Sequence, residues 1–130
     1  MWSVYTLSES TELRELTEEL VEAAEYLLKA FHKAKETGEQ EDFYQTVRPY
    51  ANHIKQLNDQ WNELAKQWIS VNKPFYLNNK QVDTASDHIE VISIQAFFPQ
   101  TSKKRFLDAH KSVVYILHAL QEEIIATKEI

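Results

Sequence analysis

Carboxylates are the residues of this sequence whose spacing could support catalysis. Glu18, Glu19 and Glu22 form an EExxE pattern. Glu39 and Asp42 form an ExxD pattern further along the chain. Clustered carboxylate oxygens suit hard cations such as Mg²⁺, which bind them together with substrate phosphates. At 100° per residue, however, Glu18 and Glu22 point away from the leucine stripe of their segment, so a pocket would require a second subunit. We therefore interpret the cluster as a solvated acidic face and keep a magnesium site as the alternative.

The two acidic patterns resemble in outline those of all-α nucleoside-triphosphate pyrophosphatases of the MazG type. This resemblance implies a Mg²⁺-dependent enzyme that releases pyrophosphate from a nucleoside triphosphate. Glutamate-rich helices also produce EExxE by chance, and the acidic start of a helix produces ExxD. The enzyme is therefore our alternative hypothesis for the function.

Other catalytic motifs are absent from the sequence. No histidine follows a glutamate by three residues, no two histidines are four residues apart, and there is no Gly-x-Ser-x-Gly elbow. With 0 Cys and 1 Gly, the chain has no thiolate ligands and cannot build a glycine-rich phosphate loop. We therefore expect a non-enzymatic protein without a cofactor. His110 lies on an apolar stripe, and we interpret it as a core histidine satisfied by a hydrogen bond.

Three consecutive cations, Lys103, Lys104 and Arg105, stand where the last predicted helix begins. A helix N-terminus carries partial positive charge and favours acidic residues, so each cation forgoes or opposes roughly 0.3 to 1 kcal/mol. In one interpretation, the cations are solvated and partly paired with acidic side chains of a neighbouring helix end. In the other, they and the free helix amides bind a phosphate, a carboxylate or an acidic partner surface. The first arrangement is the more common one.

A second candidate binding region follows the tryptophans in the middle of the chain. Trp61 and Trp68 continue an apolar stripe at helical spacing, which predicts core positions. Trp68 could instead line a ligand recess at one end of the fold with Lys73, Pro74 and Tyr76, because ligands often bind between bundle helices.

Four amphipathic segments must position these residues. Apolar residues recur at alternating spacings of three and four, which predicts helices over about 10–36, 41–71, 79–98 and 102–128. The inward stripe of the second helix runs from Phe43 to Val71. Pro49 predicts a kink or a break near its start, with Pro49 in the first turn after the break. The expected boundary residues are Ser10 as the first N-cap, Gly38 after the first helix, Asn78 or Asn79 before the third, and Thr101 or Ser102 before the fourth.

Short connections between long helices force neighbouring helices to be antiparallel. The sequence therefore predicts one domain over residues 1–130, an all-α four-helix up-and-down bundle. Residues 1–8 are apolar enough to lie against it as an arm or an extra helical turn.

The composition limits the possible partners. With 43% hydrophobic and 26% charged residues, the chain has a globular composition. A net charge of −6 argues against a nucleic-acid partner. No apolar run approaches the roughly 20 residues that span a bilayer, and the N-terminus lacks the pattern of a signal peptide. We expect a cytoplasmic protein that binds neither nucleic acid nor a membrane.

Short motifs from about residue 40 onward carry a resemblance to a known family. They are Phe43, Arg48-Pro49, Trp61, Trp68-Ile69, Val71-x-Lys73-Pro74-x-Tyr76, Gln95-Ala96-Phe97, Lys103-Lys104-Arg105-Phe106 and Ser112-Val113-x-Tyr115-x-Leu117-His118-Ala119. In these motifs the chain resembles the YppE-like family, small uncharacterised proteins of Bacillus-type Gram-positive bacteria. The resemblance implies a four-helix up-and-down bundle and no activity, because the family is known as a fold without an assigned function.

The leading hypothesis is therefore a binding module for a protein partner or a small anionic ligand. Its candidate site residues are Lys103, Lys104, Arg105, Trp68, Lys73 and Tyr76. The sequence leaves open whether the protein is a monomer or a homodimer.

Overall fold

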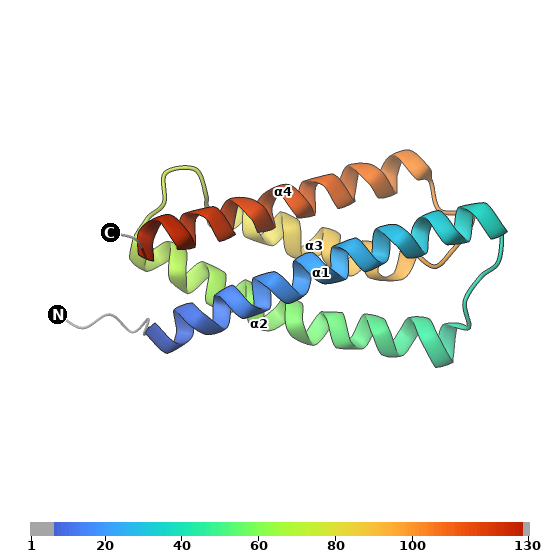
Figure 1. The fold of residues 1–130 in the computed structure, drawn as a ribbon, viewed down its shortest axis with the longest axis horizontal. Helices are drawn as coiled ribbons and strands as arrows, with labels where there is room; N and C mark the ends of the chain where they lie inside the picture. The colour runs from blue at the N-terminus through green and yellow to red at the C-terminus, as the bar shows by residue number, and fades with distance from the viewer. Residues whose placement is uncertain (1–6, 129–130) are drawn as a thin grey trace.

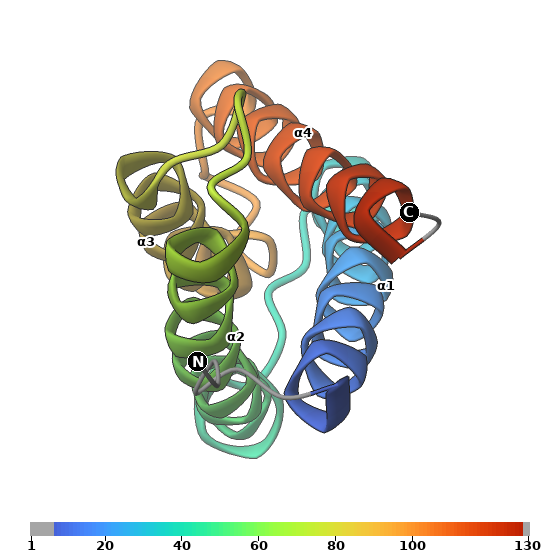
Figure 2. The same cartoon turned by 90° about the vertical axis from the view of Figure 1, so that its left-hand side faces the viewer.

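Four long helices form an antiparallel bundle in the computed structural model, which describes residues 7–128. The helices are α1 (Leu7–Thr37), α2 (Arg48–Asn72), α3 (Asn79–Gln95) and α4 (Lys103–Lys128). Successive helices run in opposite directions (Figure 1), and the end view shows α1 beside α2 and α4, with α3 on the opposite side (Figure 2). The predicted all-α, four-helix up-and-down bundle is confirmed.

The core contains the apolar stripes that the spacing predicts. Phe31 of α1 stacks on Phe106 of α4 with the ring centroids 4.1 Å apart. Trp61 of α2 is fully buried, and its indole N–H donates to the hydroxyl oxygen of Thr17 on α1 at 3.0 Å. The Thr17 hydroxyl in turn donates to the carbonyl of Leu13 at 2.7 Å. A short chain of buried hydrogen bonds therefore ties α2 to α1 inside the core.

Two residues expected on the inward stripe of the second helix are exposed instead. Phe43 and Val71 have 42% and 43% of their surface exposed. Both lie at the ends of the stripe, where the neighbouring helices no longer cover it. Phe43 packs edge-to-face on Tyr44, with 5.2 Å between the ring centroids, rather than in the core.

The helix boundaries follow local capping chemistry in most places. Asn78 accepts from the backbone N–H of Gln81, and the Gln81 side chain accepts from the Asn78 N–H, so a capping box opens α3. Gly38 ends α1 with a φ of 71°, a left-handed conformation that favours glycine. The expected N-cap at Ser10 is wrong, because α1 begins at Leu7. Glutamates in its first turns complement the helix dipole and support the earlier start.

The expected break near Pro49 takes the form of a π-helical turn, Phe43–Val47, directly before α2. The N–H of Val47 donates to the carbonyl of Asp42, five residues earlier, at 3.1 Å. Pro49 occupies the first turn of α2, where its missing N–H leaves no helical hydrogen bond unmade. A wider turn also relieves the clash of the proline ring with the preceding turn.

The connection from α3 to α4 starts earlier than predicted. α3 ends at Gln95, three residues short of the expected end, and tighter turns follow. The N–H of Phe97 donates to Ile94 O at 3.3 Å, and that of Phe98 to Gln95 O at 3.2 Å. Pro99 disfavours a helical residue before it, which explains the early end. Figure 1 places this connection at the same end of the bundle as the α1–α2 connection.

Two expectations concern the chain termini and membranes. The proposed N-terminal arm, residues 1–8, lies outside the described residues except for Leu7 and Ser8, which extend α1. Among the residues that the structure describes, no helix is long and apolar enough to cross a bilayer.

Candidate functional site

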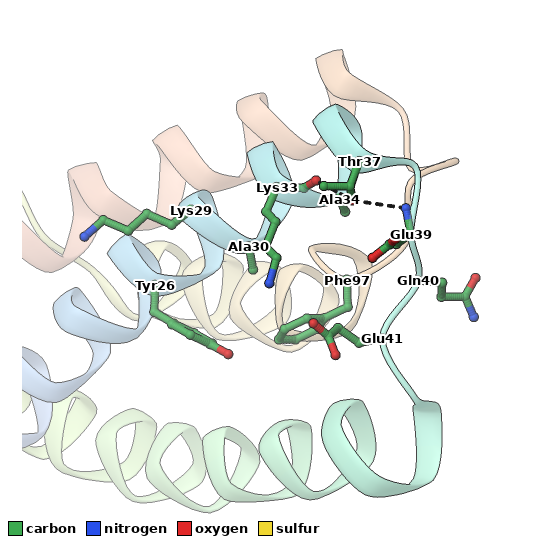
Figure 3. Close-up of a pocket in the computed structure, with 10 residues that line it drawn as sticks. All are labelled: Tyr26, Lys29, Ala30, Lys33, Ala34, Thr37, Glu39, Gln40, Glu41 and Phe97. Atoms are coloured by element: carbon green, nitrogen blue, oxygen red, sulfur yellow. Dashed lines mark hydrogen bonds between the residues drawn. The ribbon is translucent and has the colours of Figure 1, made fainter.

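A cavity of about 320 Å³ lies between the C-terminal half of α1 and the connection that follows it. Figure 3 shows its walls: α1 on one side, residues 39–41 on the other, and Phe97 from the α3–α4 connection between them. Tyr26 and Ala30 give the cavity an accessible apolar surface, and the buried Ala34 and Phe97 lie behind it. Its size suits a compact small molecule.

Charged side chains stand around this apolar surface. Lys29 and Lys33 belong to α1, while Glu39 and Glu41 belong to the connection. In Figure 3, Lys33 and the Glu41 carboxylate extend toward Phe97 from opposite walls, whereas Lys29 points away. The cavity therefore has cations on its α1 wall and anions on the wall formed by the connection.

The path of the connection is held by Thr37, the last residue of α1. Its hydroxyl donates to Lys33 O at 2.9 Å and accepts from the N–H of Glu39 at 3.1 Å. The second bond is drawn in Figure 3. Together with the left-handed Gly38, these bonds turn the chain across the end of α1 and place Glu39 and Glu41 on the wall of the cavity.

An aromatic cluster closes one side of the cavity. The ring of Tyr26 lies 5.1 Å from that of Tyr50 and 6.2 Å from that of Phe97, measured between centroids. Tyr50 and Phe97 are 5.8 Å apart. Burial, and secondly the electrostatic interaction with Tyr26, raises the pKa of Tyr50 to about 12. Tyr50 is therefore a neutral phenol at physiological pH.

The structure does not gather the acidic residues of the pyrophosphatase alternative. Glu18, Glu19 and Glu22 line a separate cavity beside α2, while Glu39 lines the pocket described above. About 22 Å of helix separates Glu22 from the end of α1. Asp42 caps the π-helical turn, where it accepts from the N–H of Gln45 at 2.7 Å. Within residues 7–128, no three acidic or histidine side chains are grouped so that they could hold a metal ion.

The basic corner, Lys103 to Arg105, lies in the first turn of α4. Lys104 pairs with Asp108 on its own helix at 3.0 Å, and both side chains are well exposed. Lys103 and Arg105 have no acidic partner at ion-pair distance among the described residues. Ser102 accepts from the Arg105 N–H at 3.3 Å, so it is the N-cap. The corner stands at the end of the bundle that holds the cavity.

In the second candidate binding region, which contains Trp68, Lys73 and Tyr76, the side chains differ in how far they are buried. Trp68 is 2% exposed and belongs to the core. Lys73 ends α2 in a left-handed conformation, with a φ of 48°. Tyr76 is 75% exposed and contacts Phe75, which is 89% exposed. Trp68 therefore faces inward and Tyr76 outward.

The interpretation of His110 is confirmed. The side chain is half-buried between α4 and α1, and its Nε2 lies 2.8 Å from the carbonyl oxygen of Ala24. A carbonyl can only accept, so Nε2 carries the proton. His110 serves the packing of the two helices.

Comparison with known proteins identifies the family. The sequence model of a bacterial domain of unknown function, DUF1798, matches residues 17–124. The chain belongs to the DUF1798 family. Its similarity to the uncharacterised protein YppE of Bacillus subtilis (strain 168) is 32% identity over 115 residues, which cover 88% of this chain and 94% of that protein. The resemblance to YppE-like proteins is confirmed.

Solved structures of related proteins share the fold. The crystal structure of B. subtilis YppE aligns with a TM-score of 0.90 at 30% identity, covering 93% of this chain and 98% of that one. A protein of unknown function from Listeria innocua aligns with a TM-score of 0.88 at 27% identity, covering 94% and 98%. A DUF1798 protein from Staphylococcus aureus aligns with a TM-score of 0.80 at 28% identity, covering 88% and 96%.

The cavity of this DUF1798 chain was missed by sequence reasoning. Tyr26, Lys33 and Glu41 were not singled out. Tyr26 carries the one available signal, because it is a large aromatic residue away from the leucine stripe of α1. The contribution of Phe97 depends on the early end of α3, which the periodicity does not encode.

Proposed function

We propose that this DUF1798 protein is a non-enzymatic binding module whose cavity holds a small apolar molecule with one anionic group. The observation that carries the proposal is the placement of Lys33 beside the apolar surface of Tyr26 and Ala30. An apolar body would lie against Ala30 and the exposed ring of Tyr26, and its carboxylate or phosphate would pair with Lys33.

The opposite wall restricts the charge of this ligand. Glu39 and Glu41 would repel a polyanion, whereas a single anionic group can approach Lys33 from the α1 side. This argument disfavours nucleoside triphosphates, the substrates of the alternative enzyme. It favours monoanions, and it tolerates a ligand that also carries a hydrogen-bond donor toward Glu41.

The basic corner has a supporting role in this proposal. Lys103, Lys104 and Arg105 stand at the start of α4, at the bundle end where α1 ends, and make the electrostatic potential there more positive. Such a field increases the local concentration of anions and their association rate, and it weakens with salt. The cations of the corner therefore affect the rate of capture more than the affinity.

Thermal unfolding with a ligand panel tests the proposal. The panel contains aliphatic and aromatic monocarboxylates, sugar phosphates, and nucleoside triphosphates with and without Mg²⁺. A ligand at about 100 times its dissociation constant adds about 2.7 kcal/mol, which raises Tm by several degrees. We expect such a shift with an apolar monoanion and its loss in Lys33→Ala. Lys111→Ala, which removes an exposed lysine on α4, is the matched control.

Two outcomes would contradict the proposal. A shift that requires both Mg²⁺ and a nucleoside triphosphate, followed by pyrophosphate release, would favour the alternative enzyme. Equal shifts in Lys33→Ala and in the parent protein would place the ligand elsewhere.

A further inference from the structure

A long groove runs between α1 and α2 on the face that these two helices form together. Its first part is a cavity of about 470 Å³ lined by Glu12, Leu16 and Glu22 of α1 and by Leu57 of α2, among others. Its second part, about 260 Å³, continues to Tyr26 and also contains Glu22 and Leu57. Because the two cavities share these residues, they form one groove, which we call the acidic groove.

The floor of the acidic groove is apolar. Its accessible apolar surface comes from the half-buried Ala23 and Leu57 and from Tyr26, which is 47% exposed, while Leu16 and Ile54 are buried at its base. Glu12 and Tyr26 are fourteen residues apart on α1, so the groove is about 21 Å long. This length corresponds to roughly four turns of an α-helix lying along it.

One wall of the groove carries a row of unpaired carboxylates. The row consists of five exposed glutamates of α1: Glu12, Glu15, Glu18, Glu19 and Glu22. None of them has an ion-pair or hydrogen-bond partner among the residues that the structure describes. The α2 wall contributes Tyr50, His53 and Gln60 and no lysine or arginine. Within residues 7–128, this negative charge therefore stays uncompensated beside the apolar base of the groove.

We infer that the acidic groove is the docking site for a cationic amphipathic helix of a partner protein. The apolar stripe of such a helix would cover Ala23, Leu57 and Tyr26, as in helix-in-groove recognition. Lysines or arginines along one flank, three and four residues apart, would meet the glutamates of α1, which have the same spacing. The charge selects the orientation of the partner and increases its association rate.

Other occupants fit the groove less well. An anionic bilayer or a nucleic acid would be repelled by the five carboxylates. A second copy of this chain offers its densest cations at Lys103 to Arg105, but Phe106, which follows them, is fully buried and cannot reach the floor. The inference concerns a different surface from the proposed ligand cavity, with which the groove shares Tyr26 alone.

A model peptide tests the inference directly. The probe is a fluorescent, amidated 15-residue helix of leucine and lysine with one apolar stripe, and binding is followed by fluorescence polarisation. A scrambled peptide of the same composition keeps the charge but loses the stripe. We expect the amphipathic peptide to bind and the scrambled one to bind at least tenfold more weakly, because the apolar floor requires a continuous stripe.

Charge-matched variants locate the site. Glu15→Gln, Glu19→Gln and Glu22→Gln, combined in one variant, should weaken peptide binding about tenfold. The control combines Glu25→Gln, Glu63→Gln and Glu122→Gln, which changes the net charge equally at exposed positions outside the groove. It should retain binding within about twofold.

Backbone amide NMR shifts provide a second readout. On peptide addition they should change along 12–26 and 50–60. Equal weakening in both triple variants, shifts elsewhere on the surface, or no binding by the amphipathic peptide would each overturn the inference. Light scattering that shows self-association lost in the groove variant would instead assign the surface to a second copy of the chain.

Discussion

The two sides of α2 differ in how their polar groups are used. Toward α3, Lys55 pairs with Glu90 at 3.2 Å, and Lys66 pairs with Asp83. The hydrogen bond to Glu90 is the main reason why the pKa of Lys55 is raised, and that from Lys66 is the main reason why the pKa of Asp83 is lowered. Toward α1, the surface carries five glutamates without partners, and the polar contact lies below it, between Trp61 and Thr17.

The buried contacts follow the same division. Asn58 is 2% exposed, and its amide N–H donates to the carbonyl of Ser86 on α3 at 2.9 Å. Asn62 donates to Asp83 and to the Ser86 hydroxyl. The α2–α3 interface is therefore completed by the residues of the chain itself. On the α1 side, packing holds the helices together and leaves the surface charge available to another molecule.

The largest expected effect on stability tests how strongly Trp61 anchors α1 to α2. Trp61→Ala should lower the free energy of unfolding by about 3–5 kcal/mol, since it leaves a large cavity in the core. Trp61→Phe, which keeps most of the ring volume but removes the hydrogen bond to Thr17, should cost about 1–2 kcal/mol. Urea denaturation measures both values. A loss below about 1 kcal/mol in Trp61→Ala would show that Trp61 does not anchor α1.

At the α2–α3 interface, we expect substitutions of Asn58 to lower the free energy of unfolding by an intermediate amount. Asn58→Ala removes the hydrogen bond to Ser86, but it also removes Oδ1 of Asn58, a buried acceptor without a partner among the described residues. The two changes partly offset each other, so the loss should be about 1 kcal/mol. Asn58→Asp should cost about 3 kcal/mol or more, because a carboxylate would be buried beside a carbonyl. Equal stability of the two variants would mean that solvent reaches this position.

The smallest expected change in the free energy of unfolding is a gain rather than a loss. Gln at positions 15, 19 and 22 removes like charges that stand three and four residues apart on α1. The free energy of unfolding should stay the same or rise by less than about 1 kcal/mol at low salt, and the gain should vanish in about 1 M salt. A loss greater than 1 kcal/mol would assign these glutamates to the stability of the fold and would weaken the case for a docking surface.

The sequence predicted the parts of the fold that depend on helical periodicity. The positions expected to face inward on α3, such as Val82 and Ile89, are buried, and so are Val113 and Leu117 on α4. Regular spacing encodes these positions because each helix has a neighbour along its whole length. The ends of the helices were less predictable, as Phe43 and Val71 show, because burial there depends on how far the neighbouring helices extend.

The position of the candidate cavity did not follow from the sequence. The hypothesis of an anion-binding corner named Lys103 to Arg105, whereas the cavity depends on the chain path after Thr37 and on the early end of α3. Capping bonds and turns determine these paths, and single residues such as Gly38 and Pro99 fix them locally. Which distant side chains they bring together does not follow from local signals.

The buried hydrogen bond between Trp61 and Thr17 gives the protein an internal reporter of solvent exchange. The indole proton of Trp61 lies on a fully buried ring beneath the acidic groove. Its replacement by deuterium therefore requires α1 to move away from α2 or the whole chain to unfold. The exchange rate of this one proton, compared with that of the most protected backbone amides, measures how often α1 separates while the rest of the bundle stays folded. A partner helix in the groove would slow this exchange without touching the indole.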